Sequence, residues 1–151
     1  MDAAGIFARK STVLDRYVQI GVAGSKLLSV SFPASVDEET PTEHELLDRI
    51  EASLAGEKQD FSDVDVALTV PTDERAVLEE VRTIPYGGSV TVDAVARMTP
   101  TLVDIDEGRE IVEAALRENP TPIVVPDHRV RDGPGATPDA VARRLRDIEG
   151  I

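Results

Sequence analysis

Two apolar-rich segments near the start of the chain predict a β-hairpin. Residues 17–22 (Tyr-Val-Gln-Ile-Gly-Val) and 27–32 (Leu-Leu-Ser-Val-Ser-Phe) are rich in β-branched and aromatic side chains. They flank Ala-Gly-Ser-Lys at 23–26, which is short enough to reverse the chain between paired strands. We therefore expect two antiparallel strands joined by a turn.

An amphipathic helix is predicted to follow the hairpin. Its apolar positions recur at helical spacing along one face: Leu46, Leu47, Ile50 and Leu54. We expect Thr40 to cap the helix, Pro41 to occupy its first position and Glu43 to complete a capping box. Gly56 fits the helix end.

From Thr72 onward the pattern is mainly helical. Thr72 is expected to cap a helix that ends in the Ile-Pro-Tyr-Gly-Gly turn at 84–88. The apolar face of that helix holds Val77, Leu78 and Val81. A short helix over 92–98 is expected to be capped by Thr91, and another helix is expected over about 106–118.

The end of the chain is predicted to hold one buried strand and one further helix. The strand is expected at 123–125 (Ile-Val-Val), and Thr137-Pro138 is expected to open the helix, which ends before Gly150. The inward positions of this helix are Val141, Leu145 and Ile148. Two short helices followed by a strand have the element order of a helix-turn-helix with a wing.

Chain length and element order together predict an α/β protein with two lobes. The 151 residues correspond to about one domain. We expect a small N-terminal lobe, made of the hairpin and one helix, over residues 1–70. A winged-helix-like lobe is expected over residues 71–151.

The charge balance indicates a salt-adapted protein. Acidic residues outnumber basic ones by 29 to 16, so the net charge is -13. Only three of the basic residues are lysines: Lys10, Lys26 and Lys58. A surface dominated by one sign is tolerated in multimolar salt, where the Debye length falls to about 3 Å. A halophile-like protein is therefore favoured over a mesophilic protein that is merely acidic.

The residues that are missing from the sequence exclude several classes of protein. The chain contains no cysteine, which excludes chemistry that needs a protein thiolate or a disulfide. No apolar stretch is long enough for a signal-peptide core or a membrane span. We expect a cytoplasmic protein without a membrane partner.

A set of separated motifs carries a family resemblance. These motifs are Arg-Thr-Ile-Pro-Tyr-Gly at 82–87, Asn-Pro at 119–120, Ile-Val-Val-Pro-Asp-His-Arg-Val at 123–130 and Glu-Gly at 149–150. In this order they resemble the alkylguanine-DNA alkyltransferases, the methylated-DNA–protein-cysteine methyltransferase family, and their alkyltransferase-like relatives. The resemblance covers essentially the whole chain, and it implies a DNA-binding second lobe.

This sequence differs from the family at the position of the alkyl acceptor. The family motif is Pro-Cys-His-Arg-Val, whereas this chain has Asp127 at the cysteine position. In the family the following His activates the cysteine through a water and a Glu orients that His; His128 and Glu149 match these two helpers. A carboxylate is a weak nucleophile toward an alkyl ether carbon. We therefore expect a protein that accepts no alkyl group and is not an enzyme.

The DNA-binding positions that the resemblance implies are Thr91, Val92, Glu110, Asn119 and Arg129. Family members have a Tyr at the Val92 position, which helps to rotate the target nucleotide. They insert an Arg from the Glu110 position to fill the space left by the flipped base. Asn119 matches a family hinge, so only part of this set is retained.

The predicted recognition helix is acidic. Its carboxylates are Asp106, Glu107, Glu110, Glu113 and Glu118, against only Arg109 and Arg117. Such a helix repels phosphate. The following loop is also shorter than in the family and is trimmed to Asp-Gly-Pro-Gly at 132–135.

Two groups of polar residues allow both a functional and a structural interpretation. Asp127, His128 and Glu149 could form a general acid/base or metal site, or His128 and Glu149 could be a buried pair that stiffens the lobe. The only cluster of basic residues in the sequence could contact phosphate, or it could be a solvated helix face with carboxylate partners. Its members are Arg129, Arg131, Arg143, Arg144 and Arg146.

Three functional hypotheses follow. The first is a non-enzymatic, alkyltransferase-like protein that recognises alkylated or otherwise damaged DNA and hands it to a repair partner. The second is a protein-interaction module that kept the fold and lost DNA binding. The third is a new hydrolytic or metal site at Asp127, His128 and Glu149. The first hypothesis implies a monomer with no cofactor and no bound metal.

The salt adaptation can be tested by equilibrium unfolding. Because high salt screens the repulsion among the excess carboxylates, the free energy of unfolding should rise steeply between low and multimolar KCl. Urea titrations across a KCl series measure this dependence. A chain that is equally stable without salt would not be salt-adapted.

Overall fold

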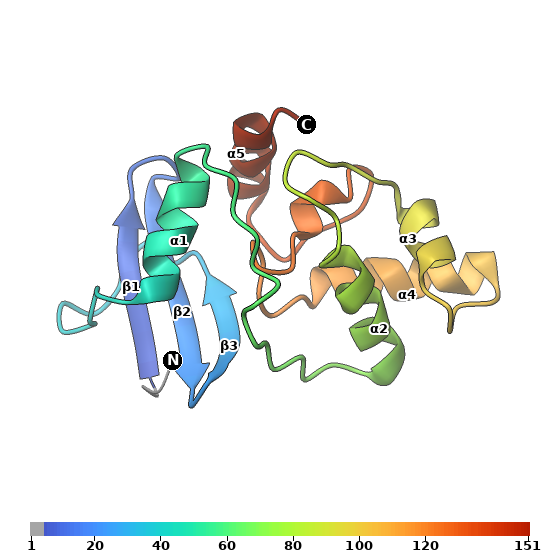
Figure 1. Ribbon diagram of the computed structural model, residues 1–151, viewed down its shortest axis with the longest axis horizontal. Helices are drawn as coiled ribbons and strands as arrows, with labels where there is room; N and C mark the ends of the chain where they lie inside the picture. The colour runs from blue at the N-terminus through green and yellow to red at the C-terminus, as the bar shows by residue number, and fades with distance from the viewer. Residues whose placement is uncertain (1–4) are drawn as a thin grey trace.

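The computed structural model describes residues 5–151 as an antiparallel sheet with one helix on its face, followed by a helical region (Figure 1). The sheet contains β1 (Gly5–Ser11), β2 (Arg16–Ala23) and β3 (Lys26–Ser31), in the order β1-β2-β3. The predicted hairpin is confirmed as β2 and β3. Strand β1 was not predicted, because only Ala8 within it is buried and the apolar alternation is weak.

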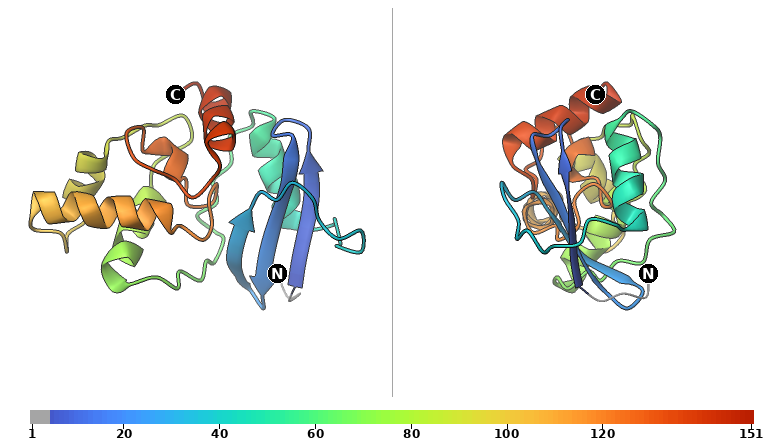
Figure 2. Two further views of the ribbon diagram at one scale, coloured as in Figure 1. Left: turned by 180° about the vertical axis from the view of Figure 1, so that it is seen from behind. Right: turned by 90° about the vertical axis from the view of Figure 1, so that its left-hand side faces the viewer.

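Helix α1 (Glu45–Leu54) lies against the sheet and buries the predicted apolar face (Figure 2). The predicted start of this helix was wrong. The cap is His44, whose Nδ1 accepts a hydrogen bond from the Leu46 amide at 3.0 Å, and not Thr40. The Pro41 carbonyl accepts a hydrogen bond from the Ala8 amide at 3.0 Å. This pairing to β1 keeps the chain before His44 out of the helix.

The helices of the second half follow the predicted order. They are α2 (Thr72–Val81), α3 (Val92–Met98), α4 (Ile105–Arg117) and α5 (Asp139–Glu149). Thr91 caps α3 as predicted, with its hydroxyl accepting from the Ala94 amide at 3.1 Å. Thr72 does not cap α2, since it lies inside the helix and Pro71 precedes it without a side-chain bond. Gly150 ends α5 in the left-handed conformation, as expected.

The predicted strand at 123–125 is wrong. Ile123 has a φ of +76°, and the Val125 amide donates to the Thr121 carbonyl at 2.9 Å, so this segment is a tight turn. Its side chains are buried as expected. The wing stays a prediction, because the segments around this turn in residues 5–151 are joined only by isolated bridges such as Val90 to Val130.

Two apolar clusters form the core, and the first crosses the predicted lobe boundary. It joins the sheet and α1 to Ile123, Val124, Val141 and Leu145 from the end of the chain. The second lies among α2, α3 and α4. Helix α5 therefore packs beside the N-terminal sheet, as both views show (Figures 1 and 2). None of the helices in the described part of the chain is long and apolar enough to cross a membrane.

A carboxyl pair at the junction of α2 and α4 makes the stability depend on pH. Interaction with the Glu118 side chain, together with burial, raises the pKa of Glu74 from its ordinary 4.5 to about 7. The folded protein therefore binds this proton more tightly than the unfolded chain does, and stability is lost as the pH rises from 4.5 through 7.

We expect Glu74→Gln to stabilise the protein at pH 8, by about 1 kcal/mol after solvent screening, and to leave it unchanged at pH 5. Urea unfolding at the two pH values measures the difference. The exposed Glu57→Gln is the matched control and should show no such change. An equal effect of Glu74→Gln at both pH values would refute the raised pKa.

Candidate functional site

The motif residues 127–129 form a single buried 3-10 turn, η1 (Asp127–Arg129). The exposed fractions of Asp127, His128 and Arg129 are 1%, 3% and 8%. Backbone bonds to the neighbouring segment fix this turn: the Val90 amide donates to the Arg129 carbonyl, and the Arg131 amide donates to the Val90 carbonyl, each at 2.9 Å. Three charged or polar side chains are thus held inside the protein by local backbone pairing.

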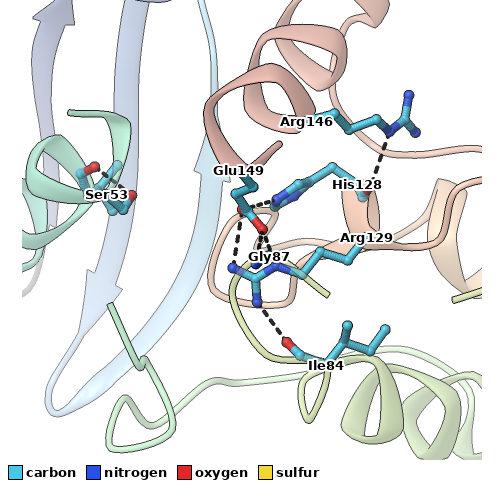
Figure 3. Close-up of polar contacts among 8 residues, drawn as sticks. Ser53, Ile84, Gly87, His128, Arg129, Arg146 and Glu149 are labelled. Atoms are coloured by element: carbon cyan, nitrogen blue, oxygen red, sulfur yellow. Dashed lines mark hydrogen bonds and ion pairs between the residues drawn. The ribbon is translucent and has the colours of Figure 1, made fainter. Parts of the chain in front are cut away.

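Glu149, the last residue of α5, organises the polar network around this turn (Figure 3). One of its oxygens lies 2.6 Å from His128 Nε2, and the other accepts a hydrogen bond from Arg129 Nε at 2.8 Å. The second oxygen also accepts from the Gly87 amide at 3.0 Å. Burial alone would raise the pKa of Glu149, but the bonds from His128 and Arg129 outweigh it and lower the pKa to about 2.

Arg129 has an internal role. Besides Glu149, its guanidinium donates to the Ile84 carbonyl at 2.7 Å and lies 5.6 Å from the centre of the Tyr86 ring. The Ile-Pro-Tyr-Gly-Gly turn is therefore tied to the C-terminal helix through this side chain. Arg129 therefore does not belong to the basic edge that was suggested to contact phosphate, because its charge is buried and paired with Glu149. Arg146 also turns inward, because its Nε donates to the His128 carbonyl at 3.0 Å.

Asp127 faces a different set of partners. Its Oδ2 accepts hydrogen bonds from Asn119 Nδ2 at 3.2 Å and from the Ala136 amide at 3.0 Å. Its Oδ1 is buried and has no hydrogen-bond partner among the described residues. Burial raises the pKa of the Asp127 carboxyl, despite the bonds from Ala136 and Asn119. No bond joins Asp127 to His128 or Glu149 in the described structure, so the three side chains do not act as one unit.

A cavity of about 190 Å³ lies beside Asp127. Residues of η1, of the loop after it and of α5 line it, and its wall includes Gly133, Gly135, Thr137, Arg143 and Arg146. In residues 5–151 no three His, Asp or Glu side chains come together in an arrangement that could hold a metal ion.

Most of the other predicted DNA-binding positions have local structural roles. Thr91 is occupied in capping α3, and the Val92 side chain lies in the second core cluster with its amide donating to Asp132 at 2.7 Å. Asn119 is buried and bonds to the Val125 carbonyl at 2.9 Å. Only Glu110 is exposed, on α4.

The exposed face of α4 is acidic, as predicted. Its two arginines are engaged by carboxylates: Arg109 pairs with Asp93, and Arg117 pairs with Glu113 at 3.3 Å. Val103 and Ile105, in the turn before and at the start of this helix, are also exposed. The surface that a recognition helix would present therefore combines uncompensated carboxylates with two apolar side chains.

Sequence reasoning missed the two backbone contacts that matter most at this site, the Ala136 amide on Asp127 and the Gly87 amide on Glu149. A backbone donor leaves no mark in residue identity. The glycines at 133 and 135 were the available signal, since an added Cβ at Gly133 would lie 2.7 Å from Leu116 Cδ1. They point to a loop that approaches its neighbours closely.

Known proteins match both the sequence and the shape. The profile described as "6-O-methylguanine DNA methyltransferase, DNA binding domain" matches residues 73–147. The Methylated-DNA–protein-cysteine methyltransferase of Methanopyrus kandleri is 37% identical over 113 residues, which cover 72% of this chain and 82% of that protein. The chain belongs to this family. The Metallosphaera sedula protein of the same name is 28% identical over 109 residues, 70% of this chain and 66% of that protein.

Solved structures show that the methyltransferase fold is shared. The Mycobacterium tuberculosis O6-methylguanine methyltransferase has a TM-score of 0.72 at 20% identity, over 97% of this chain and 92% of that chain. The same organism's OGT in complex with DNA has a TM-score of 0.72 at 21% identity, over 96% and 90%. The Pyrococcus kodakaraensis enzyme has a TM-score of 0.71 at 22% identity, over 97% and 100%. The predicted family and mixed α/β fold are thus confirmed.

The Glu149 network should be a major source of stability. Glu149→Gln leaves the buried Arg129 without its counter-charge, and we expect it to lower the free energy of unfolding by about 3 kcal/mol at pH 7. Because the pKa of Glu149 is about 2 when folded against 4.5 ordinarily, its stabilising effect is present above pH 4.5 and is lost as the pH falls toward 2.

Urea unfolding from pH 7 to pH 3 measures this effect, with the exposed Glu57→Gln as the control. The gap between the wild-type protein and Glu149→Gln should narrow toward low pH. A gap that stays constant down to pH 3 would show that the charge of Glu149 is not what stabilises the fold.

Proposed function

We propose that this protein is a non-enzymatic, alkyltransferase-like member of its family that recognises alkylated or otherwise damaged DNA. The observation that carries the proposal is the state of the acceptor position. Asp127 stands where the family motif has the reactive cysteine, and its carboxyl group is buried and held by Asn119 and Ala136. The surrounding family residues His128 and Glu149 stay in contact, with His128 Nε2 lying 2.6 Å from a Glu149 oxygen.

The family membership supports a DNA partner. The matched profile is that of a DNA-binding domain, and it covers α2 to α5 almost entirely. Without an acceptor, binding can only mark the lesion, so a second repair protein has to complete the work. We take the protein to act as a monomer in the cytoplasm, with no cofactor.

The acidic α4 determines how this binding depends on salt. Carboxylates at Asp106, Glu107 and Glu110 replace the phosphate contacts that usually dominate DNA affinity. High salt screens their repulsion, with a Debye length of about 3 Å at 1 M. Binding therefore rests on short-range contacts, and the affinity should not fall as the salt concentration rises, unlike that of a basic DNA-binding surface.

The test is fluorescence anisotropy of a duplex that carries one methylguanine, compared with the unmodified duplex, at low and multimolar KCl. We expect tighter binding of the modified duplex at both salt concentrations. Glu110→Arg should tighten binding of both duplexes at low salt and steepen the log–log salt dependence by about 1. Glu57→Arg makes the same charge change on the other lobe and should have little effect.

Negligible binding of both duplexes at both salt concentrations would contradict the proposal. The second candidate, a protein-interaction module, would then be favoured by a specific observation: Val103, exposed at 95%, stands next to the carboxylates of α4. That combination is suited to a partner with a basic, partly apolar surface.

A further inference from the structure

The loop at residues 133–136, which we call the pocket loop, is packed closely at its start. A Cβ added to Gly133 would lie 2.7 Å from Leu116 Cδ1, and it would also lie within 3.2 Å of side-chain atoms of Val92 and Val130. The backbone at Gly133 is therefore seated on the second core cluster. Only glycine permits this approach without displacing core side chains.

The other end of the pocket loop is fastened by Asp127. The Ala136 amide donates to Asp127 Oδ2 at 3.0 Å, and a Cβ added to Gly135 would lie 3.4 Å from Asp127 Oδ1. The same Oδ2 accepts from Asn119 Nδ2, and Asn119 also bonds to the Val125 carbonyl and the Thr121 amide. Asp127 thus links the segment after α4 to the pocket loop through one oxygen atom.

This link closes the acceptor position. The carboxyl carries an unpartnered Oδ1 with essentially no exposed surface, although a cavity of about 190 Å³ lies beside it. Asp127 and the pocket loop line this cavity together, but only 1% of Asp127 is exposed. An extrahelical base could make full contact with this carboxyl group only if the pocket loop moved, and the Ala136 bond opposes that movement.

From these contacts we propose that Asp127 is a positioning residue: it holds the pocket loop closed and thereby sets how readily the cavity admits a damaged base. The inference rests on the proposed function for the identity of the occupant. The fastening itself does not, since it is a property of the free protein. The residue that is the acceptor in the family has become the fastener of the pocket in this chain.

The two hydrogen bonds offer a matched pair of variants. Both end on Oδ2, so the single amide oxygen of Asp127→Asn can accept both and preserve the fastening. Asp127→Ala removes both bonds. Asp127→Ser does the same while leaving a polar group, and it serves if Asp127→Ala fails to fold.

Hydrogen exchange of the Ala136 amide tests the fastening without DNA. Ala136 is exposed as a residue, so its amide owes its protection to Asp127. We expect slow exchange in the wild-type protein and in Asp127→Asn, and exchange at least about fivefold faster in Asp127→Ala or Asp127→Ser, which corresponds to one hydrogen bond of about 1 kcal/mol. Unchanged exchange in the variants that lack the acceptor would overturn the proposal.

Binding of the methylguanine duplex tests the consequence. Releasing the loop should tighten lesion binding by about fivefold in Asp127→Ala, while Asp127→Asn should resemble the wild-type protein. Weaker binding by Asp127→Ala would overturn the proposal, because it would mean that Asp127 contacts the base. If neither the wild-type protein nor any variant binds the modified duplex more tightly than the unmodified duplex, the proposed function fails. The exchange rate of the Ala136 amide still decides whether Asp127 fastens the loop.

Discussion

The buried ion pair between Glu149 and Arg129 is the interaction on which the arrangement of the site depends. It joins the last residue of α5 to η1, and through the Ile84 carbonyl and the Gly87 amide it also holds the turn after α2. Three segments distant in sequence meet at one carboxylate. Each bond to that carboxylate compensates for the burial of charge, so the network is stable only as a whole.

The pair also shows that the polar network around His128 does not include Asp127. His128 is held by Glu149 rather than by Asp127, so a change at residue 127 leaves the network intact. Asp127 then takes part in a separate set of bonds to Asn119 and Ala136. Residue 127 and the pair formed by His128 and Glu149 thus belong to different hydrogen-bonded groups.

Elements specified by local residues were predictable, and those specified by distant contacts were not. Thr91 caps α3 and Gly150 ends α5, because a cap or a left-handed glycine is a property of a few neighbouring residues. The start of α1 was misplaced, since a bond from Ala8 to Pro41 decides it. The apolar run at 123–125 predicts a strand, whereas Ile123 lies in a turn, because burial produces the same apolar run in both.

The same distinction between local and distant determinants applies to the residues of the site. The motif identified His128 and Glu149, and the structure brings them together. Arg129 was expected at a basic edge, because residue type alone does not reveal that a counter-charge twenty positions along the chain lies beside it. The role of Asp127 was not predictable, since its partner at Ala136 is a backbone amide.

The central claim is that His128 and Glu149 keep their network although Asp127 replaces the acceptor cysteine. Its most direct test is intact-protein mass spectrometry after incubation with a duplex that carries methylguanine. The wild-type protein is expected to stay unmodified. Asp127→Cys, which places a thiol beside the preserved His128 and Glu149, is expected to gain one methyl group. A folded Asp127→Cys protein that binds the duplex and stays unmodified would contradict the retained network, and a methylated wild-type protein would contradict the loss of the acceptor.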